Sequence, residues 1–258
     1  MSQADHDLPA QAPRKKKKVR AAKVTTVIHQ DCLGGVDMTQ RRNLELSQWF
    51  TDPGLAKRIA YLTVDVAERV RPAGAEGLCL LEPSAGDGAL IAPLLTYSGV
   101  RVRAVELDPT HVETLRARFQ DLPEADIEDF RVRVHEGNFL IMHMPIIFDG
   151  CPMNPPYENG FDGLFVQRVM QVCRSFVALV RTVSMHGIDR YRQVWKDFAP
   201  DGPWVLEREV TLVLRPDFCD NTMLDTTFGA KSDFTILVGR RRLPSDPPVM
   251  PTIREWWT

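Results

Sequence analysis

The tetrapeptide Asn154-Pro155-Pro156-Tyr157 contains the residue types in this chain that best suit chemistry on a bound molecule. Two consecutive prolines hold φ at about −65° and supply no backbone N–H, so the segment is predicted to be a stiff turn. A stiff turn fixes the direction of the Asn154 amide and the Tyr157 ring and leaves main-chain carbonyls as acceptors. These groups together suit a flat molecule that carries an NH2. An ordinary proline-rich turn with an incidental aromatic is the alternative.

A second candidate site lies upstream, in Glu82-Pro83-Ser84-Ala85-Gly86-Asp87-Gly88, which follows a short apolar run. Gly86 and Gly88 allow a sharp strand-to-helix turn that brings backbone amides and a helix N-terminus up to a ligand. The turn is neither a full dinucleotide fingerprint, because position 91 is Ile, nor a phosphate loop, because no Lys-Ser/Thr pair follows.

Glu106 ends the next predicted strand, 18 residues after Gly88. A carboxylate at this position can accept hydrogen bonds from the two vicinal hydroxyls of a ribose. Leu107 beside it offers an apolar face to an adenine. The site suits a ribose and a base but has no phosphate-binding group, which favours S-adenosylmethionine over a dinucleotide.

Strands and helices that position these groups alternate along the chain. Helix is expected from Pro53 to Val70, with Thr51 or Asp52 as N-cap, and then after Gly88, over 110–119 and over 164–173. Strands are expected at 77–81, 100–108, 130–136, 146–149, 176–183, 210–214 and 234–238. The order predicts an α/β fold with a doubly wound, mostly parallel seven-stranded Rossmann-like sheet. The last two strands are expected to pair as an antiparallel hairpin at the sheet edge.

Composition narrows the class of protein. Hydrophobic residues make up 44% and the net charge is −2, which fits a globular protein without a global basic field. The five cysteines form no CxxC pair, so we expect reduced thiols, no disulfides and no metal site. No apolar run reaches about 18 residues, and the N-terminus is polar. These features predict a cytoplasmic protein of prokaryotic or phage type, with no membrane contact.

The domain organisation is predicted from shifts in composition. Residues 1–23 are expected to form a disordered basic tail, 24–243 the main domain, and 244–258 a proline-rich C-terminal tail. Within the first tail, the block 14–20 is an arm that contacts phosphates or simply a solvated segment; a nuclear-localisation signal is a weaker interpretation. Residues 185–209 are a candidate small substrate-recognition insertion.

Together the motifs resemble those of class I S-adenosylmethionine-dependent methyltransferases. The segment 82–88 resembles their first motif, and Asn-Pro-Pro-Tyr resembles the catalytic motif of the amino-methyltransferases. The order of the two is similar to that of the gamma-type DNA adenine-N6 methyltransferases. Gln48-Trp49-Phe50-Thr51-Asp52-Pro53 resembles those enzymes' N-terminal motif, in which Phe-Thr-Pro wraps the methionine end of the cofactor, although here Asp52 interrupts it.

The resemblance implies S-adenosylmethionine as cofactor and assigns residues to it. The implied cofactor residues are Phe50, Thr51, Glu82, Ser84, Ala85, Gly86, Gly88, Glu106, Leu107, Asn138 and Phe139. Asn138 stands where the family usually has Asp, and its amide oxygen can still accept a bond from the adenine amine. Phe139 is expected to pack on the adenine, with a place in the core as the alternative.

The resemblance also implies a reaction, transfer of a methyl group to the N6 amine of adenine in DNA, with short or relaxed sequence specificity. Catalysis is assigned to Asn154, Pro155, Pro156 and Tyr157, and Tyr157 is expected to stack on the target base. In this family a second aromatic from the late hairpin commonly completes the sandwich, so the resemblance implies Phe228, with a hairpin core residue as the alternative. Arg190 and Arg192 are further substrate-binding candidates, because a loop of basic and aromatic residues suits phosphates and bases. RNA adenine and the glutamine side chain of a protein remain alternative substrates.

Overall fold

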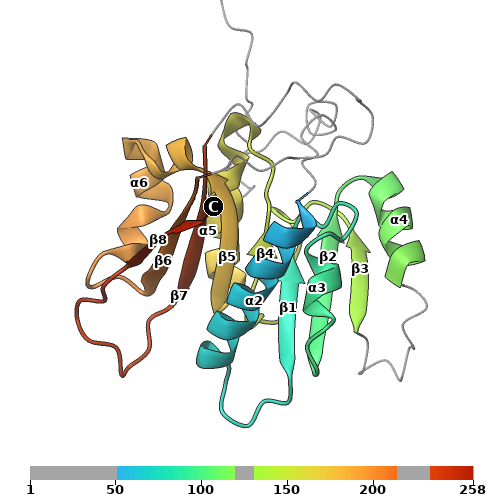
Figure 1. Cartoon of the computed structure of the whole chain (residues 1–258), viewed down its shortest axis with the longest axis horizontal. Coiled ribbons are helices and arrows are strands. Elements are labelled where there is room, and N and C mark those ends of the chain that lie inside the picture. The colour runs from blue at the N-terminus through green and yellow to red at the C-terminus, as the bar shows by residue number, and fades with distance from the viewer. Residues whose placement is uncertain (1–50, 120–130, 214–232, 258) are drawn as a thin grey trace, which may run out of the picture.

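The structure is a computed structural model that describes residues 51–119, 131–213 and 233–257. Its elements, in chain order, are α2 (Pro53–Val70), β1 (Leu78–Glu82), α3 (Ile91–Leu94), β2 (Val100–Glu106), α4 (Pro109–Phe119), β3 (Val132–Glu136), β4 (Pro152–Met153), η2 (Glu158–Gly160), α5 (Phe161–Val172), β5 (Ser175–Arg181), η3 (Thr182–Met185), α6 (Ile188–Gln193), η4 (Trp195–Phe198), β6 (Trp204–Leu212), β7 (Phe234–Arg241) and β8 (Ile253–Trp257). Helices and strands alternate, as the α/β prediction requires (Figure 1). The basic tail 1–23, Phe50 and Phe228 lie outside the described residues.

The strands form two hydrogen-bonded groups that lie side by side. β1, β2 and β3 pair in parallel, and the second group has the order β4-β5-β7-β6-β8. A parallel bridge between Leu80 and Gly150 joins them: the Leu81 N–H donates to the Gly150 carbonyl at 3.0 Å, and the Asp149 N–H donates to the Cys79 carbonyl at 2.9 Å. Figure 1 shows the resulting continuous surface, with β3 at one side and β8 at the other.

This arrangement corrects the predicted seven-stranded sheet. The described residues contain eight strands, in groups of three and five. The segment 146–149 makes only a single bridge, at Phe148, and the ladder forms further on at β4, where Pro152 supplies no N–H and the strand is two residues long. β6 and β7 pair antiparallel as expected, but β7 lies between β5 and β6 and is not at the edge. β8, from the segment expected to be a tail, pairs in parallel with β6.

Helices cover both faces of this sheet. Alternate side chains of β5 point to opposite sides, so Val177 and Leu179 pack in a cluster with α2, whereas Phe176 and Ala178 pack in a cluster with α5. α3 and α4 lie on the α2 side, against β1 and β2. Because both faces are covered, the central strands are apolar at nearly every position, which is the pattern that identifies them in the sequence.

The parallel strands β1, β2, β3 and β5 end at one edge of the sheet, the upper edge in Figure 1, and α2 begins there. Asp52 caps α2: its Oδ1 accepts from the Gly54 N–H at 2.9 Å and from the Leu55 N–H at 3.0 Å. Pro53 fills the first helical position, where an N–H is not needed. The Asp52 that interrupts the Phe-Thr-Pro pattern therefore has a structural function. In the described part of the chain, no helix has the length and hydropathy that a membrane span requires.

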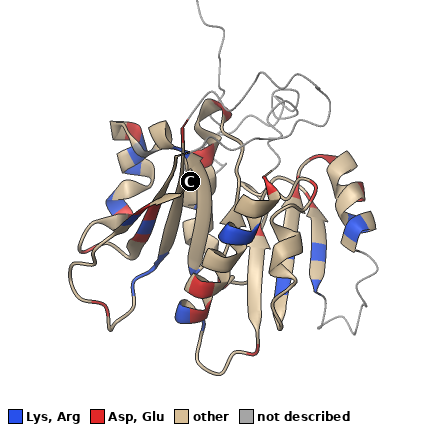
Figure 2. Ribbon diagram, in the orientation of Figure 1, with Lys and Arg blue, Asp and Glu red and all other residues tan. Residues whose placement is uncertain are grey.

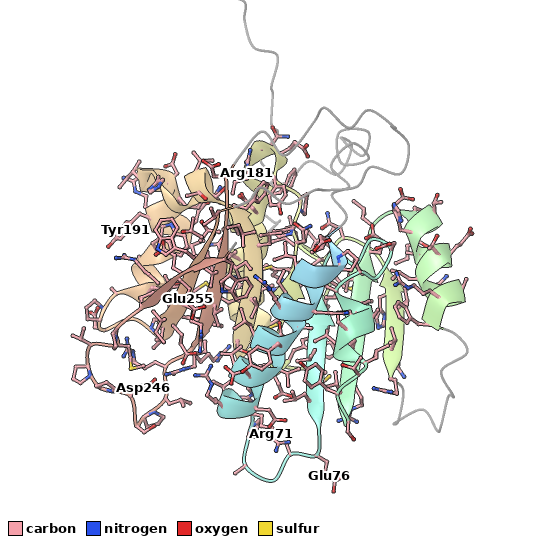
Figure 3. The ribbon with its side chains drawn as sticks, viewed as in Figure 1. Arg71, Glu76, Arg181, Tyr191, Asp246 and Glu255 are labelled. Atoms are coloured by element: carbon pink, nitrogen blue, oxygen red, sulfur yellow. The ribbon has the colours of Figure 1, made fainter. Side chains whose placement is uncertain are left out.

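A buried ionic network fixes the segment that leads to β8. Arg240 of β7 is only 4% exposed; its guanidinium pairs with Glu207 of β6 and makes two bonds to Asp246, of 2.6 and 2.8 Å. Arg69 of α2 reaches the same Glu207 at 2.8 Å. Hydrogen bonds from Arg240 hold the pKa of Asp246 below its ordinary value, so that carboxylate stays charged. The network links α2, β6, β7 and the turn before β8 (Asp246 is labelled in Figure 3).

Replacing Arg240 with Ala is expected to lower the free energy of unfolding by about 3–5 kcal/mol, because the Asp246 carboxylate loses its cation and Glu207 keeps only Arg69. Arg254 serves as the matched control: its side chain is 77% exposed and pairs with Glu209 at 3.3 Å. Arg254→Ala should change the same quantity by less than about 1 kcal/mol. Urea unfolding followed by circular dichroism measures both. Similar losses for the two variants would contradict a buried role for Arg240.

Candidate active site

Asn154 lies at the carboxyl edge of the sheet, directly after β4, and joins three segments that are far apart in sequence. Its Nδ2 donates to the Thr51 hydroxyl at 3.1 Å, and its Oδ1 accepts from the Tyr157 hydroxyl. The Ser84 hydroxyl, from the glycine-rich turn, donates to the Asn154 carbonyl at 3.4 Å. The structure therefore brings together the residues that the sequence assigned to catalysis and two of those assigned to the cofactor.

The Tyr157 ring points into the core. It is 4% exposed, meets Phe234 edge-on with ring centres 5.1 Å apart, and has its hydroxyl 3.4 Å from the Leu179 carbonyl. Burial raises the pKa of this hydroxyl well above its ordinary value, so it remains a donor. Two consequences follow for the predicted role of Tyr157. The ring must turn outward to stack on a base, and an incoming NH2 must replace the hydroxyl at Asn154 Oδ1.

Arg181 is a residue of this site that the sequence interpretation missed. It closes β5 at the same edge, as Figure 3 shows, and its Nη2 donates to the Tyr157 carbonyl. Its guanidinium carbon also lies 5.9 Å from the centre of the Tyr157 ring. An arginine within an otherwise apolar strand-length run is the signal that could have identified it.

The glycine-rich turn has the conformation predicted for it. Gly86 and Gly88 have φ values of 52° and 85°, a region that residues with a side chain rarely adopt. At Gly88 a Cβ would also lie 2.5 Å from the Phe119 ring of α4, so the turn and α4 pack too closely for a side chain. Ala85, 7% exposed, is held down by a 3.0 Å bond from its N–H to the Val105 carbonyl.

Glu106 ends β2 and fixes this turn from the next strand. Its carboxylate accepts from the N–H groups of Gly86 at 2.7 Å and of Leu107 and Asp108 at 2.8 Å each. A carboxylate offers about four acceptor directions, so one direction remains for a ligand. A ribose bound here would donate one hydroxyl hydrogen bond to Glu106 directly, and a second hydroxyl would compete with the Gly86 N–H for the same carboxylate. Leu107 is half-buried.

Glu82 is the most unusual polar group at this edge. It is 1% exposed, its Oε1 accepts from the Ser84 N–H at 3.2 Å, and its buried Oε2 has no hydrogen-bond partner among the described residues. Desolvation, with a smaller contribution from the charge of Glu106, raises the pKa of Glu82 to about 8. Figure 2 shows further acidic segments along this edge, so the site suits a cation better than a phosphate.

Asn138 and Phe139, which follow β3 after Gly137, differ in their surroundings. Asn138 Oδ1 accepts from the Leu140 N–H at 2.9 Å and so stabilises the local turn. Phe139 is 1% exposed and lies 5.4 Å from the ring of Phe165 in the core. The expected packing of Phe139 on an adenine is therefore wrong, and the core alternative is correct, because α5 covers the ring.

Arg190 is not available to a substrate, which corrects a second prediction. It bonds at 3.0 Å to Asp162, which is fully buried, and at 3.3 Å to the Gly160 carbonyl just after the catalytic turn. Asp162 also accepts from the Ser184 hydroxyl. A Cβ on Gly163 would lie 1.2 Å from Arg190, so this glycine lets the arginine cross α5. Arg190 thus connects α6 to the end of the Asn-Pro-Pro-Tyr turn.

The neighbouring residues of α6 are exposed. The Arg192 side chain is 71% exposed, 3.9 Å from Asp189, and Tyr191 is 52% exposed and labelled in Figure 3. Val183 and Ile188 beside them are 64% and 60% exposed. This rim next to the catalytic turn combines one cation with an aromatic and two aliphatic side chains.

Comparison with known proteins supports the fold. No family model and no curated protein matches the sequence, whereas many solved structures match the coordinates. A candidate class I S-adenosylmethionine-dependent methyltransferase from Listeria monocytogenes has a TM-score of 0.56 at 15% identity, over 80% of this chain and 65% of its own. A candidate RNA methyltransferase from Pyrococcus horikoshii has a TM-score of 0.55 at 17% identity, over 78% of this chain and 89% of its own.

A third match is the methyltransferase subunit of a type I restriction-modification system from Streptococcus thermophilus. Its TM-score is 0.54 at 16% identity, over 77% of this chain and 46% of that subunit. The chain has the class I methyltransferase fold. It spans less than two thirds of the Listeria and Streptococcus proteins.

The buried Glu82 predicts a pH dependence of stability. The folded chain keeps a proton on Glu82 up to a pH of about 8, whereas the unfolded chain loses it near the ordinary glutamate pKa of 4.5. Stability should therefore fall as the pH rises between these values, by up to about 1.4 kcal/mol per pH unit, and then level off. Urea unfolding from pH 5 to 9 should show this fall in the wild type and a flatter profile in Glu82→Gln. Parallel profiles would contradict the raised pKa.

The two arginines of α6 should differ in the same assay at constant pH. Arg190→Met leaves the Asp162 carboxylate buried without its cation and is expected to lower the free energy of unfolding by about 3–5 kcal/mol. Arg192→Met, two residues away and exposed, should change it by no more than about 0.5 kcal/mol. A reversed order would show that Arg190 is not the structural member of the pair.

Proposed function

We propose that this chain transfers a methyl group from S-adenosylmethionine to the exocyclic N6 amine of adenine in DNA. The observation that carries the proposal is the hydrogen-bonded junction of Asn154 with Thr51 and Ser84. It places a turn that suits a flat NH2 group against the segments that suit this cofactor. Short or relaxed sequence specificity is part of the proposal, because 185–209 is the one candidate recognition segment within the described residues.

The described residues fit S-adenosylmethionine. The unpartnered Oε2 of Glu82 can accept from a cationic amino group once Glu82 releases its proton, the remaining acceptor direction of Glu106 can take a ribose hydroxyl, and Leu107 offers an apolar face to a base. The acidic edge favours a ligand that carries positive charge and no phosphate. When bound, this cofactor supplies an electrophilic methyl group on a sulfonium.

The chain's own contribution is to prepare the amine. The lone pair of an exocyclic amine is delocalised into the purine, which makes it a poor nucleophile. Hydrogen bonds from its two N–H groups to Asn154 Oδ1 and the Pro155 carbonyl localise that lone pair and aim it. Thr51 accepts from the Asn154 NH2 and so keeps the amide oxygen turned toward the substrate. No general base is required before transfer, because the methylated amine is acidic.

Tyr157 has two positions in this scheme. In the structure its hydroxyl satisfies Asn154 Oδ1 and its ring fills the core next to Phe234. With an adenine in place, the amine takes over the bond to Asn154 and the ring is released to stack on the base. In duplex DNA the adenine must first leave the helix. The exposed rim of Val183, Ile188, Tyr191 and Arg192 is then the surface next to the flipped base.

RNA adenine is the second candidate, since a solved structure of similar fold is named as a candidate RNA methyltransferase and another belongs to a restriction-modification system. The amine chemistry is the same for both polymers. Contacts to the 2′-hydroxyl distinguish them.

The decisive experiment incubates the protein and S-adenosylmethionine with unmethylated DNA and, in parallel, with total RNA, and measures N6-methyladenine by nucleoside mass spectrometry. We expect the product in DNA and a loss of about 10²–10³-fold in turnover for Asn154→Ala, which removes the amide acceptor. Asn159→Gly is the matched control, because Asn159 is exposed and has a φ of 51° that glycine accepts.

Methyladenine in RNA alone would transfer the proposal to RNA. A blank in both polymers would refute it and direct attention to a protein glutamine side chain. Equal activity of the Asn154 and Asn159 variants would remove Asn154 from the catalytic group.

A further inference from the structure

A groove of about 520 Å³ lies between α2 and β8, separate from the catalytic turn. Lys57, Arg58 and Tyr61 of α2 form one wall, and Arg208, Glu255 and Trp257 form the other. Its base is the apolar cluster between α2 and the sheet, which also contains Tyr157. Trp257 packs against this cluster, so the groove and the catalytic turn rest on the same layer of side chains.

The groove is positively charged. Three of its lining residues are cations and one is an acid, Glu255. The Glu255 carboxylate is already neutralised, because it pairs with Arg208 at 2.5 Å and accepts from the Trp257 indole N–H at 3.1 Å. Lys57 and Arg58 are exposed and face outward (Figure 2 shows the blue band on α2). The local charge is opposite to that of the acidic edge where the cofactor is proposed to bind.

The groove also carries aromatic surface that a soluble domain has little reason to expose. Tyr61 is 61% exposed on a helix whose inward residues are fully packed. The Arg58 guanidinium lies 5.1 Å from the centre of the Trp257 ring, so one cation is held over an aromatic face. A cation next to an exposed aromatic ring suits a ligand with alternating phosphates and planar bases.

The position of the groove suits a strand that continues from the catalytic turn. Thr51, which holds Asn154, lies two residues before Pro53, the first residue of α2, and Arg58 comes five residues after Pro53. At about 1.5 Å per residue, Arg58 lies about 7.5 Å along the helix axis from Pro53, or roughly two nucleotide steps of about 3.4 Å each in a duplex strand.

We propose that the α2–β8 groove binds a segment of polynucleotide strand that flanks the target base, with phosphates on Lys57 and Arg58 and a base on Tyr61. The inference rests on the proposed function and adds a second contact surface to it. Charge complementarity decides the occupant: an anionic strand matches two outward cations and an exposed ring. The contact is independent of sequence, which agrees with the relaxed specificity proposed above.

The test uses the full chain and a fluorescein-labelled mixed-sequence single strand of about 16 nucleotides, with DNA, RNA and duplex DNA in separate arms. Fluorescence anisotropy gives the Kd over a range of salt concentrations. The variant Lys57→Gln with Arg58→Gln should raise the Kd about tenfold and reduce the slope of log Kd against log salt by about 1 to 2. Tyr61→Ala should raise the Kd about tenfold with the slope unchanged.

β8 supplies matched controls, because alternate residues of a strand point to opposite faces. Arg254 and Trp256 lie on the face away from the groove; Arg254 pairs with Glu209, and Trp256 is 72% exposed. Arg254→Gln combined with Arg116→Gln, an exposed arginine of α4, removes two cations elsewhere, and Trp256→Ala removes an exposed ring. Both controls should leave the Kd within about twofold. All substituted residues are exposed, and thermal melts check that the fold is kept.

Methyl transfer measured with the same variants separates this inference from the proposed function. Groove variants that raise the KM for the polynucleotide, without changing that for S-adenosylmethionine, support it. Groove and control variants with equal Kd values overturn it even if the protein methylates DNA. Binding that depends on the groove residues, without any methylated product, would support the groove proposal and refute the proposed reaction. If the wild type binds no polynucleotide in any arm, both proposals fall.

Discussion

The site depends on how one amide, that of Asn154, is held. Its NH2 donates to the Thr51 hydroxyl just before α2, and its oxygen accepts from the Tyr157 hydroxyl. The backbone carbonyl of Asn154 accepts from Ser84 of the glycine-rich turn. Each contact requires a different element to end at the same edge of the sheet. The parallel pairing of β1, β2 and β3 and the bridge from Leu80 to Gly150 provide that edge. The two prolines make the arrangement stiff, because they restrict the backbone between Asn154 and Tyr157. The fold therefore acts mainly as a frame that keeps this amide in one orientation.

Charge is divided between two parts of the molecule. At the carboxyl edge, Glu82 and Glu106 face the same turn, and the buried Oε2 of Glu82 has no partner among the described residues. Such a group destabilises the folded chain at neutral pH, and it is at functional sites that proteins tolerate this kind of local conflict. On α2 the balance is reversed, because Lys57 and Arg58 face solvent and Glu255 is neutralised by Arg208. A cationic cofactor and an anionic polymer would thus be drawn to neighbouring but distinct surfaces, which limits competition between them.

The sequence predicted the features that depend on local chemistry and missed those that depend on contacts with residues far along the chain. The Asp52 cap, the positive φ of Gly86 and Gly88 and most strand positions follow from residue type and spacing, and the structure confirms them. The burial of Phe139 and the inward use of Arg190 depend on α5, which comes later in the chain, so neither could be inferred from its neighbours. β8 was missed because its sequence is short and mostly exposed, as in a tail. It is a strand only because β6 offers it an unpaired edge, and the sequence does not show that edge. Phe50 and Phe228 lie outside the described residues and remain predictions.

The Arg190 ion pair changes how the segment 185–209 should be understood. In the sequence this arginine suggested a surface that contacts the substrate, whereas in the structure it ties α6 to Asp162 and to the Gly160 carbonyl at the end of the catalytic turn. Arg181 holds the same turn at the Tyr157 carbonyl. The exposed side chains of Tyr191 and Arg192 therefore belong to a helix, α6, that Arg190 bonds to the end of the Asn-Pro-Pro-Tyr turn. A substrate bound at this rim would therefore act on the turn through the partly buried Arg190, without a hinge between the rim and the turn. Outward movement of Tyr157 must then occur within a turn whose backbone is fixed, so we expect a rotation of the side chain and not a displacement of the loop.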